Sequence, residues 1–153
     1  MKILVLANGA SSHTTKWVRG YIRRGHEVHL VFCKDHELKN DDKIDDCYVH
    51  RLKYRSGIGY YLNIFKLKRL FNRINPDVVN VHYASGYGTL ARLAKIGPCV
   101  LSVWGSDVYD FPYQNKQNMN IIKKNLLHAQ QIVSTSQAMA SQTSQLANIL
   151  LSE

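Results

Sequence analysis

The stretch Pro98-Cys99-Val100-Leu101-Ser102-Val103-Trp104-Gly105-Ser106-Asp107-Val108-Tyr109-Asp110 decides the fold class that we predict. Its first half is short, apolar and β-branched, which is typical of a buried strand. The strand leads directly into a polar loop in which Gly105 lets backbone amides approach a ligand. In a parallel α/β sheet, ligands bind at the loops that follow the carboxyl ends of strands. This loop is therefore the first candidate for a functional site.

The same order, a buried strand followed by a polar loop and an amphipathic segment, recurs along the chain. Strands are predicted at 2–7, 28–32, 48–52, 77–82, 100–103 and 131–133. The first main helix is predicted to run from a cap at Ser12 or Thr14 to Arg24. The others are predicted at 60–74, through 90–94 to the turn at Gly97-Pro98, at 120–127 and at 139–151. This alternation predicts a Rossmann-like α/β fold, a doubly wound and mostly parallel sheet with helices on both faces. The length of 153 residues fits one domain, residues 1–153.

Four loops are expected at the carboxyl edge of this sheet: 9–13, 82–88, 104–107 and 134–136. The loop from Gly9 to His13 precedes a helix, whose N-terminus favours anions. It lacks the further glycines of a dinucleotide fingerprint, so a dehydrogenase is only the third alternative. His82 is either held by a backbone hydrogen bond or catalytic. Asp107 is a base, a hydroxyl-binding group or a helix cap.

Aromatic residues in these loops give the site a second character. Tyr83 and Trp104 offer flat apolar surfaces with polar edges, which suit sugar rings, although aromatic residues more often serve packing. His13 and His82 alone do not make a convincing metal site. Three cysteines, odd in number and far apart, indicate reduced thiols and not a disulfide framework. No apolar run approaches the length that spans a membrane.

The net charge of +9 is unevenly distributed. From Cys47 to Pro76 there are seven Lys and Arg residues and no acid. Residues 60–74 carry a helical apolar stripe, widened by two aromatic residues: Tyr60, Ile64, Leu67, Phe71 and Ile74, with Tyr61 and Phe65. Such a stripe either packs on the sheet or lies as a basic amphipathic helix on an anionic membrane. We do not expect nucleic acid as a partner.

Five segments, taken together, resemble a known family over nearly the whole chain. They are Lys2–Leu6 with the loop Gly9–His13, Arg24–Val28, Pro76–His82, Leu101–Asp107 and Ile132–Ser136. In this order they resemble the N-terminal domain of family 4 glycosyltransferases, whose GT-B fold has two facing Rossmann-like domains. The resemblance implies transfer of a sugar from a nucleotide sugar to a saccharide or lipid-linked acceptor. It also implies retention of configuration, with neither a metal nor another cofactor.

From the loops and the resemblance we expect His82 and Asp107 to be catalytic. The expected substrate-binding residues are Gly9, Ala10, Ser11, His13, Tyr83, Trp104, Gly105, Ser106 and Ser136. Trp104 stands where members of the family often have a histidine, and an indole cannot relay a proton.

The family's nucleotide-binding C-terminal domain has no counterpart before Glu153. We therefore expect the acceptor-binding half of a cytoplasmic glycosyltransferase, inactive by itself, at the inner face of the membrane. Its expected partners are a nucleotide sugar, a saccharide acceptor and an anionic membrane bound through residues 60–74. The alternative is a stand-alone Rossmann-like module that binds a nucleotide or a polyanion without catalysis.

Overall fold

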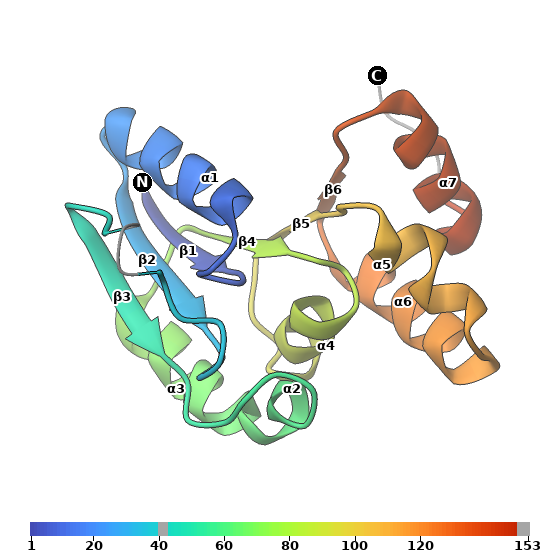
Figure 1. Ribbon diagram of the computed structural model, residues 1–153, viewed down its shortest axis with the longest axis horizontal. Coiled ribbons are helices and arrows are strands. Elements are labelled where there is room, and N and C mark those ends of the chain that lie inside the picture. The colour runs from blue at the N-terminus through green and yellow to red at the C-terminus, as the bar shows by residue number, and fades with distance from the viewer. Residues whose placement is uncertain (40–42, 150–153) are drawn as a thin grey trace.

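The computed structural model describes residues 1–39 and 43–149 (Figure 1). Within this part of the chain, six strands form one sheet in the order β3-β2-β1-β4-β5-β6, and every neighbouring pair is parallel. In chain order they are β1 Lys2–Leu6, β2 Glu27–Phe32, β3 Cys47–Arg51, β4 Val78–His82, β5 Cys99–Ser102 and β6 Gln131–Val133. The order is that of the Rossmann fold, and the sheet is fully parallel where we predicted a mostly parallel one.

Helical segments connect the strands. They are α1 Ser12–Arg23, α2 Gly59–Leu62, α3 Ile64–Ile74, α4 Gly86–Leu93, α5 Ser106–Tyr109, the 3₁₀ helix η2 Phe111–Tyr113, α6 Lys116–His128 and α7 Gln137–Ala147. The short α5 and η2 were not predicted. The predicted end of the last helix at residue 151, and the end of the predicted domain at residue 153, lie outside the described residues. None of the described helices is long and apolar enough to cross a membrane.

The predicted helix at 60–74 is in fact two helices that meet at Asn63. The side chain of Asn63 is fully buried, and its amide donates to Tyr54 O and accepts from Tyr54 N, both at 3.1 Å. These bonds tie the preceding loop to the junction. Backbone bonding still continues across it, because Asn63 N donates to Gly59 O and Leu67 N to Asn63 O.

Two apolar layers hold the sheet, one on each face. Alternate residues of a strand point to opposite faces, so Ile3 and Val5 pack under α1 while Leu4 and Leu6 face the other layer. That second layer is built with Leu67 of α3 and other residues of α4 and α6. Figure 1 shows α1 on one side of β1 and β2, and α2 to α4 on the other. Burial on both faces explains the nearly continuous apolar runs of the strands.

The topology decides which loops become neighbours. Because all strands are parallel, their carboxyl ends share one edge. β1 pairs with both β2 and β4, and β4 pairs with β5, so the loops after these strands lie next to one another. The chain leaves β1 toward one face and β4 toward the other, which opens a crevice between them.

Candidate functional site

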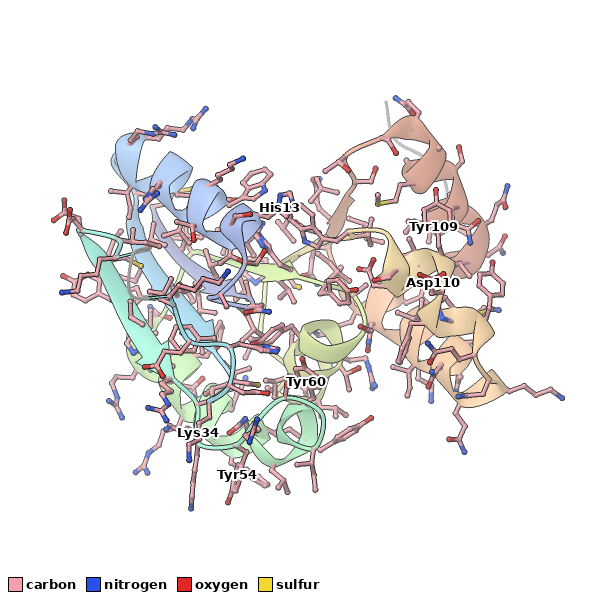
Figure 2. All side chains as sticks on the ribbon, viewed as in Figure 1. His13, Lys34, Tyr54, Tyr60, Tyr109 and Asp110 are labelled. Carbon is pink, nitrogen blue, oxygen red and sulfur yellow. The ribbon has the colours of Figure 1, made fainter. Side chains whose placement is uncertain are left out.

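A pocket of about 480 Å³ lies at this crevice. Its lining comes from the loops after β1, β2, β4 and β5 and from the adjacent helices: Asn8, Ser11, His13, Thr14, His36, Tyr60, His82, Tyr83, Tyr87, Trp104 and Ser106. Figure 2 shows His13 and Tyr60 on opposite sides of the crevice. No acidic side chain lines the pocket among the described residues. The lining therefore combines aromatic surfaces with neutral or basic hydrogen-bonding groups.

A second hollow, of about 490 Å³, runs along the outer side of α1 between Lys16 and Arg24. All of its lining comes from α1 and the residue that ends it. The crevice pocket instead collects polar side chains from several elements at the carboxyl edge of the sheet. Convergence of that kind is what a binding site requires, so we place the candidate site in the crevice.

His82, at the end of β4, is the most unusual residue of the pocket. It is only 4% exposed, and neither of its ring nitrogens has a hydrogen-bond partner in the described part of the chain. Burial lowers the pKa of His82 to about 4, and the charge of nearby His13 acts in the same direction. At neutral pH the ring is therefore uncharged, with one donor and one acceptor nitrogen.

Trp104 lies between the two histidines. Its ring centre is 4.9 Å from that of His13 and 5.3 Å from that of His82. The indole Nε1 is also buried without a partner within residues 1–39 and 43–149. A buried polar atom without a hydrogen bond costs free energy. The ring nitrogens of His82 and Trp104 are therefore candidates for hydrogen bonds to a ligand.

The carboxylate of Asp107 is bound to the backbone and does not line the pocket. Asp107 is fully buried; its Oδ1 accepts from Trp104 N at 3.0 Å and Gly105 N at 2.9 Å, and its Oδ2 from Ala84 N at 2.8 Å. A catalytic role of Asp107 stays a prediction. In the structure its carboxylate joins the loops after β4 and β5.

The loop after β1 supplies Asn8 and Ser11 to the pocket and the first turn of α1 supplies His13, whereas Gly9 and Ala10 do not line it. A Cβ on Gly9 would lie 2.7 Å from the carbonyl oxygen of His36 and 2.9 Å from the ring of Phe32, so only glycine fits. Ala10 N donates to Asn8 Oδ1 at 2.9 Å. The side chain of Ser11, the N-cap of α1, makes no capping hydrogen bond. The first backbone N–H groups of α1 are therefore left without a side-chain cap beside the pocket.

The loops after β4 and β5 also meet through side chains. Tyr83 has a left-handed backbone (φ 83°), and its hydroxyl is hydrogen-bonded to Ser106 Oγ. Gly105 has φ 125°, a conformation that a residue with a Cβ rarely adopts. Tyr83 and Ser106 line the pocket as expected, and Gly105 gives the loop its shape.

Ser136 is not part of this pocket. It is the N-cap of α7, where its hydroxyl oxygen accepts from Met139 N at 3.2 Å. Ser136 lies outside the pocket because of the sheet order, and its binding of substrate stays a prediction. β6 lies beyond β5, so the loop after it is one strand farther from the crevice.

The sequence did not single out the wall that His36, Tyr60 and Tyr87 form. Cys33 N donates to Tyr87 Oη at 3.0 Å, and Tyr87 Oη lies 2.7 Å from His36 Nδ1. Since the tyrosine oxygen already accepts one bond, its proton is best given to His36 Nδ1, which leaves Nε2–H as the free donor of that ring. Burial lowers the pKa of His36, which favours this neutral form. The position of His36 just past β2 is the signal that could have found it.

Comparison with known families agrees with this geometry. A family model described as glycosyl transferase 4-like matches residues 2–136. The chain belongs to the glycosyl transferase 4-like family. This confirms the resemblance at the level of the family, and membership indicates a glycosyltransferase-type function.

One similar solved structure is the Bordetella bronchiseptica enzyme WbmG in complex with NAD and UDP. The TM-score is 0.53 at 14% sequence identity, with 86% of this chain and 51% of WbmG covered. This likeness shows the Rossmann-like fold alone, and the glycosyl transferase 4-like chain spans about half the length of WbmG. No curated protein matches the chain.

Proposed function

We propose that this domain is the acceptor-binding half of a retaining glycosyltransferase that uses a nucleotide-sugar donor and a saccharide or lipid-linked acceptor. Family membership supports sugar transfer. The observation that carries the proposal is the pocket in which His82 and Trp104 keep unpaired nitrogens beside aromatic surfaces. Aromatic faces with a few convergent hydrogen-bonding groups suit the apolar faces and hydroxyl edges of a sugar.

In the proposed reaction, the bond from the anomeric carbon to the donor diphosphate breaks and a bond to the acceptor oxygen forms. The proton of the acceptor hydroxyl passes to a diphosphate oxygen. His82 would donate its remaining ring N–H to the oxygen of that hydroxyl and hold it on the same face of the sugar as the departing diphosphate, because its imidazole is neutral at pH 7 and keeps one N–H. The N-terminus of α1, with Ser11 and His13 beside it, would face the donor's phosphates.

The chain would work with a second domain and at a membrane. The nucleotide-binding half would lie outside it, so the chain alone is expected to be inactive, and no metal or other cofactor is required. The acceptor would be reached at the cytoplasmic face of an anionic membrane. The basic composition of residues 47–76 supports that location.

The test is a sugar-transfer assay with a panel of nucleotide sugars. It uses the natural protein that contains this chain, beside the same protein carrying His82→Ala. We expect transfer that His82→Ala abolishes while circular dichroism shows an intact fold. His26→Ala, which alters a histidine before the amino end of β2, is the matched control and should leave transfer unchanged. Transfer that survives His82→Ala would contradict the role of His82, and no transfer with any donor would contradict the function.

The alternative, a binding module without catalysis, is favoured by one observation. Asp107 is bonded to the backbone, so no carboxylate of residues 1–39 and 43–149 lines the pocket to pair with His82 as acid and base. Calorimetry of the chain with UDP and with NAD separates the cases. Tight binding of either nucleotide by the chain alone would favour the module, because in the leading proposal most of the nucleotide site lies elsewhere.

A further inference from the structure

The surface of α2 and α3 that faces away from the core carries large apolar side chains. Phe65 is 87% exposed, Ile58 67% and Leu62 48%. Large side chains exposed to this degree in one short segment are unusual on a soluble surface. Tyr61 and Phe65 were expected to widen the apolar stripe of residues 60–74, which either packs on the sheet or lies on a membrane. Both are exposed, so the two residues belong to an outward surface and not to the packed part of the stripe.

The geometry of the helix separates the inward and outward stripes. Leu67 and Ile74 of the predicted inward stripe are buried, and Tyr60, Ile64 and Phe71 pack partly buried against them. Ile58, Leu62 and Phe65 each precede an inward residue by two positions. Two positions correspond to about 200° around an α-helix, which is the opposite side. We call Ile58, Leu62 and Phe65 the apolar ridge.

Positive charge flanks the ridge. Five basic residues of this part of the chain are exposed: Lys53, Arg55, Lys66, Arg69 and Arg73. The ammonium of Lys66 also donates to Arg51 O at 3.1 Å. Arg69 follows Phe65 by four residues and so continues the line of the ridge. Two acids of the loop after β2 have other partners, since Asp35 accepts from Ser56 N and Oγ, and Glu37 lies 3.7 Å from Arg51. Within residues 1–39 and 43–149, no acid lies in salt-bridge range of these five cations.

We infer that the apolar ridge inserts into an anionic lipid surface while the flanking cations bind the head groups. An apolar row bordered by Lys and Arg is the pattern of helices that lie in the membrane interface. Each basic residue near an anionic surface adds roughly 1 kcal/mol, or about fivefold, to binding. An acidic protein would match the charges but not the protruding Phe65, which favours lipid as the occupant.

The ridge is coupled to the pocket through α2. Tyr60 is partly buried and lines the pocket, whereas Ile58 and Leu62, each two residues away, are exposed. One helical turn therefore contributes to both surfaces. Contact of the ridge with a membrane would keep the crevice near the lipid head groups, within reach of a lipid-linked acceptor. Only this last step rests on the proposed function.

The experiment measures binding of the 153-residue chain to vesicles by co-sedimentation. Vesicles of phosphatidylglycerol and phosphatidylcholine are compared with vesicles of phosphatidylcholine alone, at low and high salt. We expect binding to the anionic vesicles that weakens with salt. Phe65→Ser should reduce binding about tenfold and Arg69→Gln about fivefold. The matched controls on α6, Leu127→Ser and Lys123→Gln, remove an exposed apolar and an exposed basic side chain elsewhere and should have no effect.

A second measurement reports insertion directly. In Phe65→Trp, the added indole should show blue-shifted emission on vesicle binding and be quenched by brominated acyl chains. Absence of binding to anionic vesicles would overturn the inference. So would binding that Phe65→Ser leaves unchanged, or self-association that Phe65→Ser removes in the absence of vesicle binding.

Failure here and failure of the proposed function are distinguishable. Vesicle binding needs neither donor nor chemistry, so a protein that binds vesicles but transfers no sugar contradicts only the function. A protein that transfers sugar to a soluble acceptor but does not bind anionic vesicles contradicts only the inference about the ridge.

Discussion

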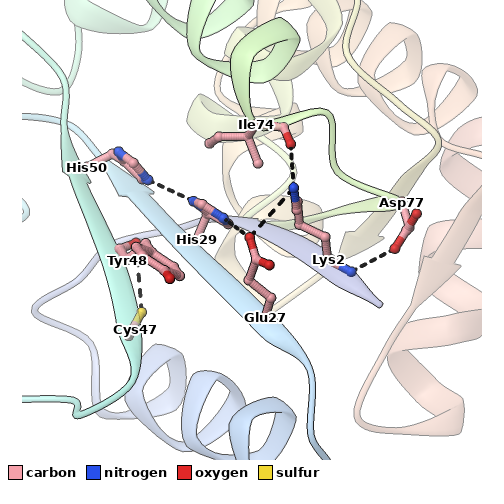
Figure 3. A network of polar contacts seen from close by, with 8 residues as sticks. All are labelled: Lys2, Glu27, His29, Cys47, Tyr48, His50, Ile74 and Asp77. Carbon is pink, nitrogen blue, oxygen red and sulfur yellow. Dashed lines mark hydrogen bonds and ion pairs between the residues drawn. The ribbon is translucent and has the colours of Figure 1, made fainter.

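Two buried histidines in the same sheet differ in what their ring nitrogens do. His29 of β2 is bonded on both sides, with Nε2 2.8 Å from Glu27 Oε1 and Nδ1 2.9 Å from His50 Nε2 (Figure 3). His82 of β4 has no partner for either nitrogen in the described part of the chain. The first histidine completes a structural network, and the second has hydrogen-bonding capacity left for a ligand. Burial alone therefore does not distinguish the two histidines, whereas their hydrogen bonding does.

The network around His29 also has a defined direction. The Nε2–H of His29 donates to the carboxylate of Glu27. The Nδ1 of His29 then accepts the hydrogen bond from the Nε2–H of His50. The bond from His29 is the main cause of the lowered pKa of Glu27, and Lys2 contributes from 3.6 Å. Burial lowers the pKa of His50. Both ring nitrogens of His29 therefore have partners within the fold.

The largest expected effect concerns a carboxylate that is fully engaged although it lies beside the open site. Asp107→Ala would leave three backbone N–H groups, one buried and two partly buried, without their acceptor. At roughly 1–3 kcal/mol for each such group, we expect a loss of about 4 kcal/mol in the free energy of unfolding. Urea denaturation with an unchanged m-value measures it. A loss below about 1 kcal/mol would contradict the ordering role that we assign to Asp107.

The second largest effect is expected on sugar transfer, where His82 and His29 should differ. His82→Ala should lower sugar transfer by about 100-fold or more, which is typical for the loss of a group at the reacting centre. His29→Ala should leave transfer almost unchanged, because its nitrogens serve Glu27 and His50. Steady-state rates of both variants in the natural protein decide the matter. Equal losses would remove the distinction between the open and the closed site.

Acid should act on the stability of the domain through His82. The folded pKa is about 4, below the usual value of 6.5, so the unfolded chain binds the proton more readily. Stability should therefore fall as the pH drops from about 6.5 toward 4, by at most about 3 kcal/mol from this residue. Thermal or urea unfolding across this range measures the fall. His82→Leu should flatten it, and an unchanged slope in that variant would assign the effect to other groups.

A smaller effect is expected at the closed site. His29→Ala removes two hydrogen bonds and leaves a gap beside Tyr48, whose ring stacks on that of His29 at 4.8 Å. We expect a loss of about 2 kcal/mol in the free energy of unfolding. The measurement is a urea titration at pH 7.5. A neutral result would mean that the network is replaced by water at no cost.

The smallest effect concerns the proton of Tyr87. Tyr87→Phe removes the donor to His36 Nδ1 and the acceptor of Cys33 N, which should cost about 1 kcal/mol. Proton–nitrogen NMR of the imidazole should show the Nε2–H form of His36 in the parent chain and a mixture of forms in the variant. The Nδ1–H form in the parent chain would contradict the assignment.

The sequence predicted the fold well because the strands are buried on both faces. Runs such as Ile3 to Leu6 carry a strong signal of that environment. The errors fall on short elements. The four-residue α5 has too few turns to show a period, and the junction at Asn63 depends on a bond to Tyr54 that no periodicity reveals.

The site was predicted only in part, since a sequence shows which loops follow strands but not the order of the strands. His82, Tyr83 and Trp104 do meet, because β4 and β5 are neighbours. Ser136 is excluded because β6 lies farther out, and His36 is included because β2 lies next to β1. The sequence also does not show whether the side chain of Asp107 points to the pocket or to the backbone. That direction depends on where the backbone N–H groups of Trp104, Gly105 and Ala84 lie in the folded chain.

The two loops that share the carboxylate of Asp107 are not independent of each other. A ligand that displaces Trp104 also pulls on the amide of Ala84, where the turn into α4 begins. Thermal fluctuations of the two loops should therefore be correlated, and the conformational entropy of this wall is lost during folding and not when a ligand binds. A pocket with such a wall is preorganised, so its affinity for a ligand is not reduced by the cost of ordering two separate loops.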